Sequence, residues 1–508
     1  MRRNLKVENK NYSKRTPNRV PSGNLVRPPS APELINPSSF EDDQHIVVRR
    51  PEESKARSES TQDIQISLKS ALDHIKLNPE ESREVPNYLE IESIEQSNDG
   101  GERPGIDLVA VIDNSGSMRT DKIELVKATL EFMVTQLGDS DRLCLVEFNN
   151  QALRLCPLTV MNETGKTEVN RIIRNVQAGG GTNIQDGLEI GMRVLADRRI
   201  ENNITSLLLM SDGQDNECST ILQRSHGVLE NYCPKIRSGF TIHTFGYGAG
   251  HDAQLLDKIA EMGNGGFYYV ENNESIGFAF ANCLGELMSV VADEINVILN
   301  LQPCGHPVQF SKIYSDNGDC SFKVQALVSG AKKQSVFVLK YSASQVTEDQ
   351  RVEPVKATVT YKLASTGEVK TKECQLSVVL SSSDQPEVIN QDVMVHFYRA
   401  KTADVLKQAS ELADQNQFQQ AKTSVLACSE EIKHSLVSEN EVVKALLEDL
   451  AEGARGLESR SSWESGGKAC VKSAHRGHMN QRSAKKSVYQ NVLQKKANAS
   501  YEVFMSKR

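Results

Sequence analysis

The sequence lacks the long apolar runs, the aromatic content and the charge excess that mark several protein classes. Among its 508 residues only 5% are aromatic and one is tryptophan, so any core must be mainly aliphatic. No stretch reaches the roughly 20 apolar residues of a membrane-spanning helix. The basic N-terminus also has no apolar segment of the kind that a secretory signal contains. A net charge of −8 argues against a nucleic-acid-binding protein. These absences favour a cytoplasmic protein without a transmembrane segment.

Cysteine is present, but never in the pairs that usually bind zinc. The ten cysteines are scattered singly, which argues against a RING or another common zinc module and favours reduced thiols. Cys218 with Cys233, and Cys304 with Cys320, could still pair as disulfides. A Gly-x-x-x-x-Gly-Lys-Ser/Thr loop is also absent, so nothing predicts P-loop phosphate binding.

The first 60 residues differ in composition from the rest of the chain. Residues 1–60 are rich in Asn, Pro, Ser, Arg and Glu and show little apolar periodicity, so we expect a disordered tail. A segment that docks on an anionic membrane or on a partner is the alternative interpretation of its basic first part.

Helical and strand patterns alternate between residues 104 and 291, which is typical of an α/β domain. The run from Ile106 to Ile112 is apolar and mostly β-branched, so it predicts a central strand buried on both faces of a parallel sheet. Apolar residues at 123, 126, 130, 133 and 137 predict one buried helical face. We predict a doubly wound, mostly parallel, Rossmann-like sheet. Its further elements are expected as helices near 166–176, 184–197 and 276–291, and as strands near 204–211 and 240–247.

From residue 292 to residue 383 the apolar period changes to two, which predicts an antiparallel β-sandwich. Two short alternating runs, at 63–69 and 87–94, precede the α/β region and have no helices of their own. We predict that these strands, within residues 61–100, join the sandwich and make the α/β region an insertion into it. An isolated hairpin is the alternative, and it would be marginal in water.

Residues 386–508 carry helical periodicity and short loops, which predict antiparallel neighbouring helices. Three helices are expected up to about residue 458. Their apolar stripes are expected to form a core, although a groove for a partner helix would give the same pattern. Trp463 is expected to anchor the following segment on this bundle. His475 and His478 have no acidic companion nearby in the sequence and are expected on the surface.

Oxygen-bearing side chains follow two of the predicted strands and one glycine-rich loop, Gly179–Gly181. The carboxyl ends of parallel strands meet at the edge where α/β sheets bind ligands. Carboxylate and hydroxyl oxygens suit a hard divalent cation, Mg²⁺ before Zn²⁺. The alternative is that Asp113 and Ser115 only accept backbone hydrogen bonds within a turn. The five candidate metal-binding residues are Asp113, Ser115, Ser117, Thr182 and Asp212.

The order and spacing of these five residues resemble the metal-ion-dependent adhesion site (MIDAS) of von Willebrand factor type A (VWA) domains. The resemblance covers roughly residues 104–290 and includes the glycine- and aromatic-rich segments at 245–248 and 265–270. It implies that the three hydroxyls bind Mg²⁺ (or Mn²⁺ or Ca²⁺) directly, and that the two carboxylates bind it directly or through water. It also implies a vacant coordination position that an Asp or Glu of a protein ligand can fill.

The C-terminal region is similar to a region found beside A domains in intracellular proteins, the A-domain-interacting or vwaint-like region. The likeness includes the segment Trp-Glu-Ser-Gly-Gly-Lys-Ala at 463–469. Some plant relatives with this architecture are RING-type ubiquitin ligases. The absence of a RING here argues against ubiquitin transfer by this chain.

We therefore expect a scaffold that binds a partner's acidic side chain through a metal ion, and not an enzyme. A carboxylate from the helical region could instead reach the metal, which would be an intramolecular contact with the VWA domain. A substrate-recruiting component of a ubiquitin ligase pathway is one alternative. A Mg²⁺-dependent phosphohydrolase with Asp113 as nucleophile is another, but Ser115 stands where such enzymes usually carry a second carboxylate.

Overall fold

The computed structural model describes most of the chain after residue 62. The predicted disordered tail, residues 1–60, lies outside the described residues apart from Phe40. None of the described helices is both long and apolar enough to cross a membrane. Cys233, Cys304 and Cys320 are free thiols, so neither disulfide considered from the sequence is formed. The described residues are 40, 63–77, 79–93, 103–119, 121–212, 221–236, 239–248, 251–270, 273–315, 317–344, 346, 348–381, 387–482 and 489–507.

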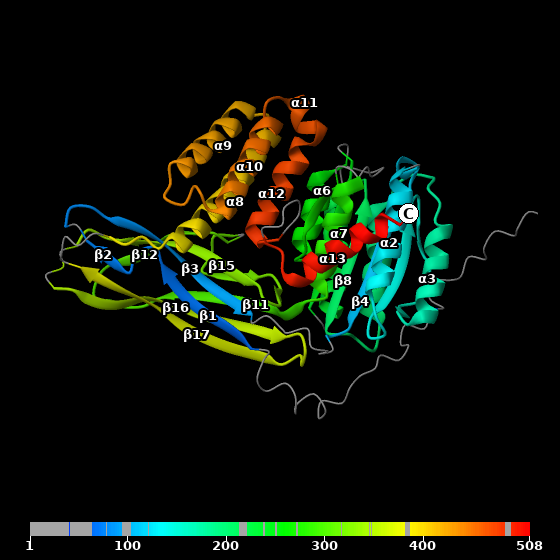
Figure 1. Cartoon of the computed structure of the whole chain (residues 1–508), viewed down its shortest axis with the longest axis horizontal. Helices are drawn as coiled ribbons and strands as arrows, with labels where there is room; N and C mark the ends of the chain where they lie inside the picture. The colour runs from blue at the N-terminus through cyan, green and yellow to red at the C-terminus, as the bar shows by residue number, and fades with distance from the viewer. Residues whose placement is uncertain are drawn as a thin grey trace, which may run out of the picture. The chain divides into compact units, whose positions relative to one another are not determined.

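The α/β domain, in which Figure 1 labels β4 and β8, is built on a seven-stranded sheet in the order β10-β9-β8-β4-β5-β6, with β7 also paired to β5. Five strands are parallel, and only β6 and β7 run antiparallel to β5. Every residue of β4 is buried, which confirms the predicted central strand and the mostly parallel α/β fold. The strand bounds are β4 (Ile106–Asp113), β5 (Arg142–Phe148), β6 (Ala152–Arg154), β7 (Thr159–Val160), β8 (Ile204–Ser211), β9 (Phe240–Tyr247) and β10 (Phe267–Val270).

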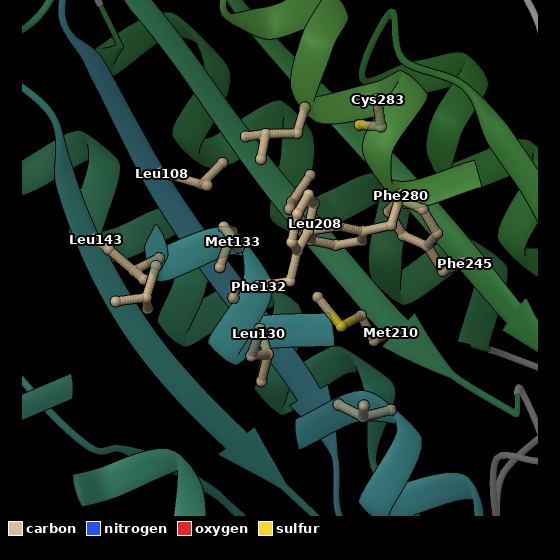
Figure 2. Close-up of a cluster of buried hydrophobic side chains, with 14 of the residues drawn as sticks. Leu108, Leu130, Phe132, Met133, Leu143, Leu208, Met210, Phe245, Phe280 and Cys283 are labelled. Atoms are coloured by element: carbon tan, nitrogen blue, oxygen red, sulfur yellow. The ribbon is translucent and has the colours of Figure 1, made fainter. Parts of the chain in front are cut away.

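Helices cover both faces of this sheet because side chains of β4 alternate between two apolar clusters. Leu108 belongs to the cluster that contains α2 and α7, and Figure 2 shows its side chain among those of Phe132, Met133 and Leu208. Val109 belongs to the cluster on the other face, with α4 and α6. The helix bounds are α2 (Asp121–Gln136), α3 (Glu163–Asn175), α4 (Ile184–Asp197), α5 (Ile221–Tyr232), α6 (Ala253–Met262) and α7 (Asn273–Leu287).

The helix expected over 276–291 ends earlier than predicted, at Leu287, because a strand starts at Val290. This strand, β11, belongs to the second of two further sheets, ordered β1-β3-β15-β12 and β13-β11-β16-β17-β2, with β14 paired to β11. The register pairs Leu89 of β3 with Ser335 of β15, so a strand before the α/β domain is bonded to a strand after it. The bounds are β1 (Ile64–Ser70), β2 (His74–Lys76), β3 (Arg83–Ser93), β11 (Val290–Leu301), β12 (Val308–Ile313), β13 (Ser321–Val324), β14 (Leu327–Val328), β15 (Lys332–Tyr341), β16 (Gln350–Leu363) and β17 (Val369–Ser381).

The helical region packs around a core to which α8, α9, α10 and Trp463 all contribute. Trp463 is 4% exposed and its indole N–H donates to Asp414 at 3.3 Å, so it lies against the bundle. Gly467 follows it, and a Cβ at that position would lie 2.7 Å from the carbonyl oxygen of Gly456, so only glycine permits this close crossing of α10. The helix bounds are α8 (Gln391–Asp414), α9 (Phe418–Lys433), α10 (Glu441–Gly456), α11 (Arg460–Ser462), α12 (Lys468–Asn480) and α13 (Val492–Met505), with a π turn at Trp463–Gly467.

The expectation of surface histidines in α12 is wrong. His475 is 7% exposed and contacts the carbonyl oxygen of Ala403 through Nδ1 at 2.8 Å. His478 is 5% exposed, and its Nε2 lies 2.8 Å from a carboxylate oxygen of Asp449. The acidic companion that is missing from the local sequence is therefore supplied by α10.

The last helix, α13, packs on the α/β domain beside α7 and α2 (Figure 1). The ring of Tyr501 meets the ring of Phe132 edge-on, with 5.0 Å between centroids. A Cβ at Gly277 of α7 would lie 1.8 Å from that tyrosine ring, so the glycine makes room for it. One face of α13, with Ala497, Tyr501 and Phe504, thus packs in the apolar cluster on the α2 face of the sheet.

Candidate metal centre

The turn after β4 brings its carboxylate and its two hydroxyls into one hydrogen-bonded group. Asp113 is the last residue of β4 and its Oδ1 accepts the backbone N–H of Ser115 at 2.9 Å. The hydroxyl oxygens of Ser115 and Ser117 lie 3.0 Å apart. Asp113 Oδ2 accepts the hydroxyl of Ser211, the last residue of the neighbouring strand β8, at 2.5 Å. The predicted turn therefore gathers three oxygen-bearing side chains at the carboxyl end of the sheet.

The glycine-rich loop that carries Thr182 is joined to this turn by two backbone hydrogen bonds. Gly116 N–H donates to the carbonyl of Gly180 at 3.0 Å, and Gly179 N–H donates to the carbonyl of Asn114 at 2.7 Å. Gly180 has a φ of +86° and would, with a Cβ, press on Asn149 at 3.3 Å, so glycine is needed there. Thr182 follows within this joined loop and is 5% exposed.

Asp212 follows β8, which pairs with β4, so the two carboxylates lie at the ends of adjacent parallel strands. Its side chain is 2% exposed, its Oδ1 has no hydrogen-bond partner among the described residues, and its Oδ2 accepts a hydrogen bond from Lys122 at 2.9 Å. Burial raises the pKa of the Asp113 carboxyl, and the negative charge of Asp212 raises it further. Bonds from Ser115 and Ser211 oppose that rise. Of the two buried carboxylates, Asp212 is thus the one that pairs with a lysine ammonium, which is 39% exposed.

The donor set fits a hard cation. All five predicted side chains offer oxygen, and the unpartnered Oδ1 of Asp212 is a buried acceptor that a cation would satisfy. Among the described residues no group of three or more His, Cys, Asp or Glu side chains could hold a metal ion. Three of the candidate ligands are hydroxyls, so a metal here would depend on Ser and Thr rather than on such a group.

Two residues near the carboxylates were not identified from the sequence. Lys122 is the second residue of α2 and ion-pairs with Asp212. His251 follows β9, contacts the carbonyl of Gly248 through Nδ1 at 2.5 Å, and has an Nε2 without a partner. Burial lowers the pKa of His251, while the nearby charge of Asp212 acts to raise it. The sequence placed His251 only in a segment that resembles the late strands of a VWA domain, and neither residue was predicted as a ligand, because both reach the centre from other strands and helices.

A second buried carboxylate, Asp107, lies at the opposite end of β4. Asp107 accepts two hydrogen bonds from Arg142, at 2.8 and 2.7 Å, and lies 2.9 Å from a guanidinium nitrogen of Arg198. Asn202 donates its backbone and side-chain N–H groups to the same carboxylate, both at 3.0 Å. Every oxygen of this carboxylate is therefore paired with protein groups.

Comparison with known proteins identifies the domain that carries the candidate centre. The family model for the von Willebrand factor type A domain matches residues 107–282. The chain is 29% identical over 221 residues to "E3 ubiquitin-protein ligase WAV3" of Arabidopsis thaliana, covering 43% of this chain and 28% of that protein. It is 26% identical over 231 residues to "Uncharacterized protein YfbK" of Escherichia coli, covering 45% of this chain and 39% of that protein. The chain thus matches less than half the length of these relatives.

Two solved structures share the fold over most of the chain. The ArnB paralog VWA2 of Sulfolobus acidocaldarius aligns with a TM-score of 0.51 and 15% identity over 83% of this chain and 100% of that one. A von Willebrand factor type A protein of Catenulispora acidiphila aligns with a TM-score of 0.54 and 14% identity, over 78% of this chain and 91% of that one. Residues 107–282 alone could not supply such coverage, so the likeness in fold extends beyond the α/β domain.

Proposed function

We propose that the VWA domain of this chain, residues 107–282, is a metal-dependent docking module of a scaffold protein. Asp113, Ser115, Ser117, Thr182 and Asp212 would hold Mg²⁺, or Mn²⁺ or Ca²⁺ in its place. An Asp or Glu side chain of a protein partner would complete the coordination. The observation that carries this proposal is the burial of Asp113 and Asp212 at adjacent strand ends with an unpartnered carboxylate oxygen.

The local charge supports a cation at this position. Two carboxylates and one lysine leave one negative charge in excess, and burial makes that excess costly. A divalent ion would reverse the sign of the site to one positive charge. The remaining positive charge, together with the near-octahedral preference of Mg²⁺, would favour an anionic sixth ligand. An acidic side chain is such a ligand, whether a partner supplies it or the helical region does.

A scaffold of the ubiquitin pathway is the second candidate. Three relatives carry ubiquitin-protein ligase names, and all three are plant proteins of Arabidopsis thaliana. The sequence contains no Cys-x-x-Cys pair that would build a RING, so this chain would recruit substrate while another chain transfers ubiquitin. A phosphohydrolase is the weakest candidate, because Ser115 occupies the position where such enzymes usually need a general acid.

Titration calorimetry of Mg²⁺ and Mn²⁺ into the metal-free full chain tests the metal site. We expect one ion to bind per chain, and both Asp113→Asn and Thr182→Ala to weaken it. Asp139→Ala is the matched control, because Asp139 is an exposed carboxylate in the turn before β5, at the opposite end of the sheet. The proposal would be contradicted if the folded wild type bound no metal, or if the two site variants bound metal as tightly as the wild type.

Affinity capture of partners in Mg²⁺ and in EDTA tests the docking role separately. Partners that elute with EDTA, and that Ser115→Ala/Ser117→Ala fails to capture, are expected to contribute an acidic side chain. Equal capture in both buffers would mean that partner binding does not depend on the metal ion. A ubiquitin ligase among the metal-dependent partners would favour the second candidate.

A further inference from the structure

We propose that a cavity where the VWA domain, the β-sandwich and the helical region meet binds a small phosphorylated polyol. The cavity has a volume of 430 Å³, within the range of roughly 300 to 1,000 Å³ that ligand pockets occupy. Its lining residues come from all three parts of the chain, so a ligand there would contact each of them. The site is separate from the candidate metal centre and uses none of its residues.

Four buried cations line this cavity in the described part of the chain, and one of them, Arg476 of α12, is already ion-paired with Asp257 and Glu261. The other three, Lys333 of β15, Arg399 of α8 and Arg482 after α12, are 6%, 2% and 6% exposed. Of these three, only Arg482 has an ion pair with a described residue, between its Nε and Glu286 of α7 at 2.7 Å. The charges that act on Lys333 are those of Glu286, Arg482 and Arg399, so the four groups form one cluster.

The cluster carries more positive charge than its surroundings neutralise. Lys333 and Arg399 bond to backbone carbonyls at the end of α12, namely those of Asn480 and His478, both at 2.6 Å. A helix C-terminus contributes about half a negative charge. With one carboxylate this leaves an excess of about 1.5 positive charges. Buried charge of that size calls for a counter-ion.

The cavity also has buried hydrogen-bond donors that are left unpaired by the residues the structure describes. They are Arg482 Nη1, Asn480 Nδ2 and His243 Nε2. Because His243 Nδ1 accepts the N–H of Gly266 at 3.1 Å, its Nε2 carries the proton when the ring is neutral, and burial lowers the pKa of this ring well below its usual range. These three N–H groups and the cations match the oxygens of a phosphate group.

The cavity also contains buried hydrogen-bond acceptors. A bare phosphate ion would leave these acceptors unpaired. Glu286 Oε2 and Gln325 Oε1 line the cavity as buried acceptors without partners. They require donors, which hydroxyl groups supply. Asp293 and Glu294 line another stretch of the wall, and the basic charge that acts on Asp293 is that of Lys362 rather than the cationic cluster. Phosphate and hydroxyls in one compact molecule therefore match the polar groups best.

Calorimetry and thermal unfolding of the full chain test this inference, with EDTA present so that failure of the metal site has no influence. The probes are glucose 6-phosphate, inorganic phosphate, glucose, and vesicles containing phosphatidylinositol phosphate. We expect saturable binding of glucose 6-phosphate, at least tenfold weaker binding of inorganic phosphate, and no binding of glucose. Binding of the vesicles without binding of soluble phosphates would overturn the proposal, because the cavity would then not be the site.

Variants locate the binding. Asn480→Ala removes a donor that bonds to nothing in the protein, and Lys333→Met removes one cation; each is expected to weaken glucose 6-phosphate at least tenfold. Lys495→Met is the matched control, since Lys495 is exposed on α13 and away from the cavity lining. Unchanged affinity in Asn480→Ala and Lys333→Met, or no saturable binding of any phosphate probe to the wild type, would contradict the inference.

Discussion

The two ends of strand β4 carry the same kind of residue in opposite electrostatic situations. Asp107 and Asp113 are both fully buried carboxylates on one strand. Asp107 is bonded to Arg142, paired with Arg198 and capped by two N–H groups of Asn202. Among the described residues, Asp113 accepts bonds only from Ser115 and Ser211, and it lies beside a second carboxylate. A buried carboxylate with its own arginines is part of the scaffold, whereas one surrounded by hydroxyls is suited to an added cation.

The largest effect is expected at the end where the charges are balanced. Arg142→Ala leaves Asp107 buried and short of its main partner, so it should cost about 3 to 5 kcal/mol of stability. Differential scanning calorimetry of the full chain should show a large fall in the Tm of the VWA domain. A Tm within about 2 °C of wild type would mean that Asp107 does not depend on Arg142 for its charge balance.

At the other end of β4, a substitution of Asp113 should change metal binding much more than the stability of the fold. Asp113→Asn removes a charge that burial disfavours, so metal-free stability should change by no more than about 1 kcal/mol. Metal affinity should fall by more than about 100-fold, since even the partners of metal ligands account for 10- to 100-fold. Calorimetric titration and unfolding of the same sample check both parts. A large loss of metal-free stability would contradict the contrast between the two ends.

A smaller effect is expected from the lysine that accompanies Asp212. Lys122 is 39% exposed, so its ion pair is worth only about 0.2 to 1 kcal/mol. Lys122→Met should tighten Mg²⁺ binding about 2- to 5-fold, because the metal no longer competes with the ammonium group. Weaker binding in Lys122→Met would show that the lysine supports the metal instead of competing with it.

The last effect appears only at higher pH and concerns a half-buried carboxylate, Asp293, that has no arginine and no ring of hydroxyls among its described neighbours. Burial raises the pKa of Asp293 from 3.8 to about 6, so the folded chain favours its protonated form. Its contribution to stability is complete below pH 3.8 and is lost as the pH rises through about 6. Asp293→Asn should therefore raise the Tm at pH 7.5 by about 2 to 4 °C and change nothing at pH 4. Equal gains at both pH values would contradict this assignment.

Much of the α/β domain was predictable from the sequence because its signals are local. The strands at 204–211 and 240–247 and the helix at 184–197 have the predicted bounds, since apolar runs and the capping residue Asn183 delimit them.

Outside the α/β domain, strand β12 was missed because a bulge between Phe310 and Lys312 breaks its alternation. His475 and His478 were misplaced because their partners come from other helices.

The candidate metal centre was predictable in part for the same reason. Asp113, Ser115 and Ser117 form a local pattern, and Asp212 ends an apolar strand in the same way. The sequence did not predict that Lys122 and His251 lie near these carboxylates. Their positions depend on how α2 and the segment after β9 pack around Asp212.

Anomalous diffraction from crystals of the full chain grown with Mn²⁺ would locate a bound cation directly. We expect one anomalous peak at the carboxyl ends of β4 and β8, among Asp113, Ser115, Ser117, Thr182 and Asp212. We expect no peak beside Asp107, where arginines already satisfy the carboxylate. An intact fold without a peak at the first position, or with manganese bound elsewhere, would contradict the proposed metal site.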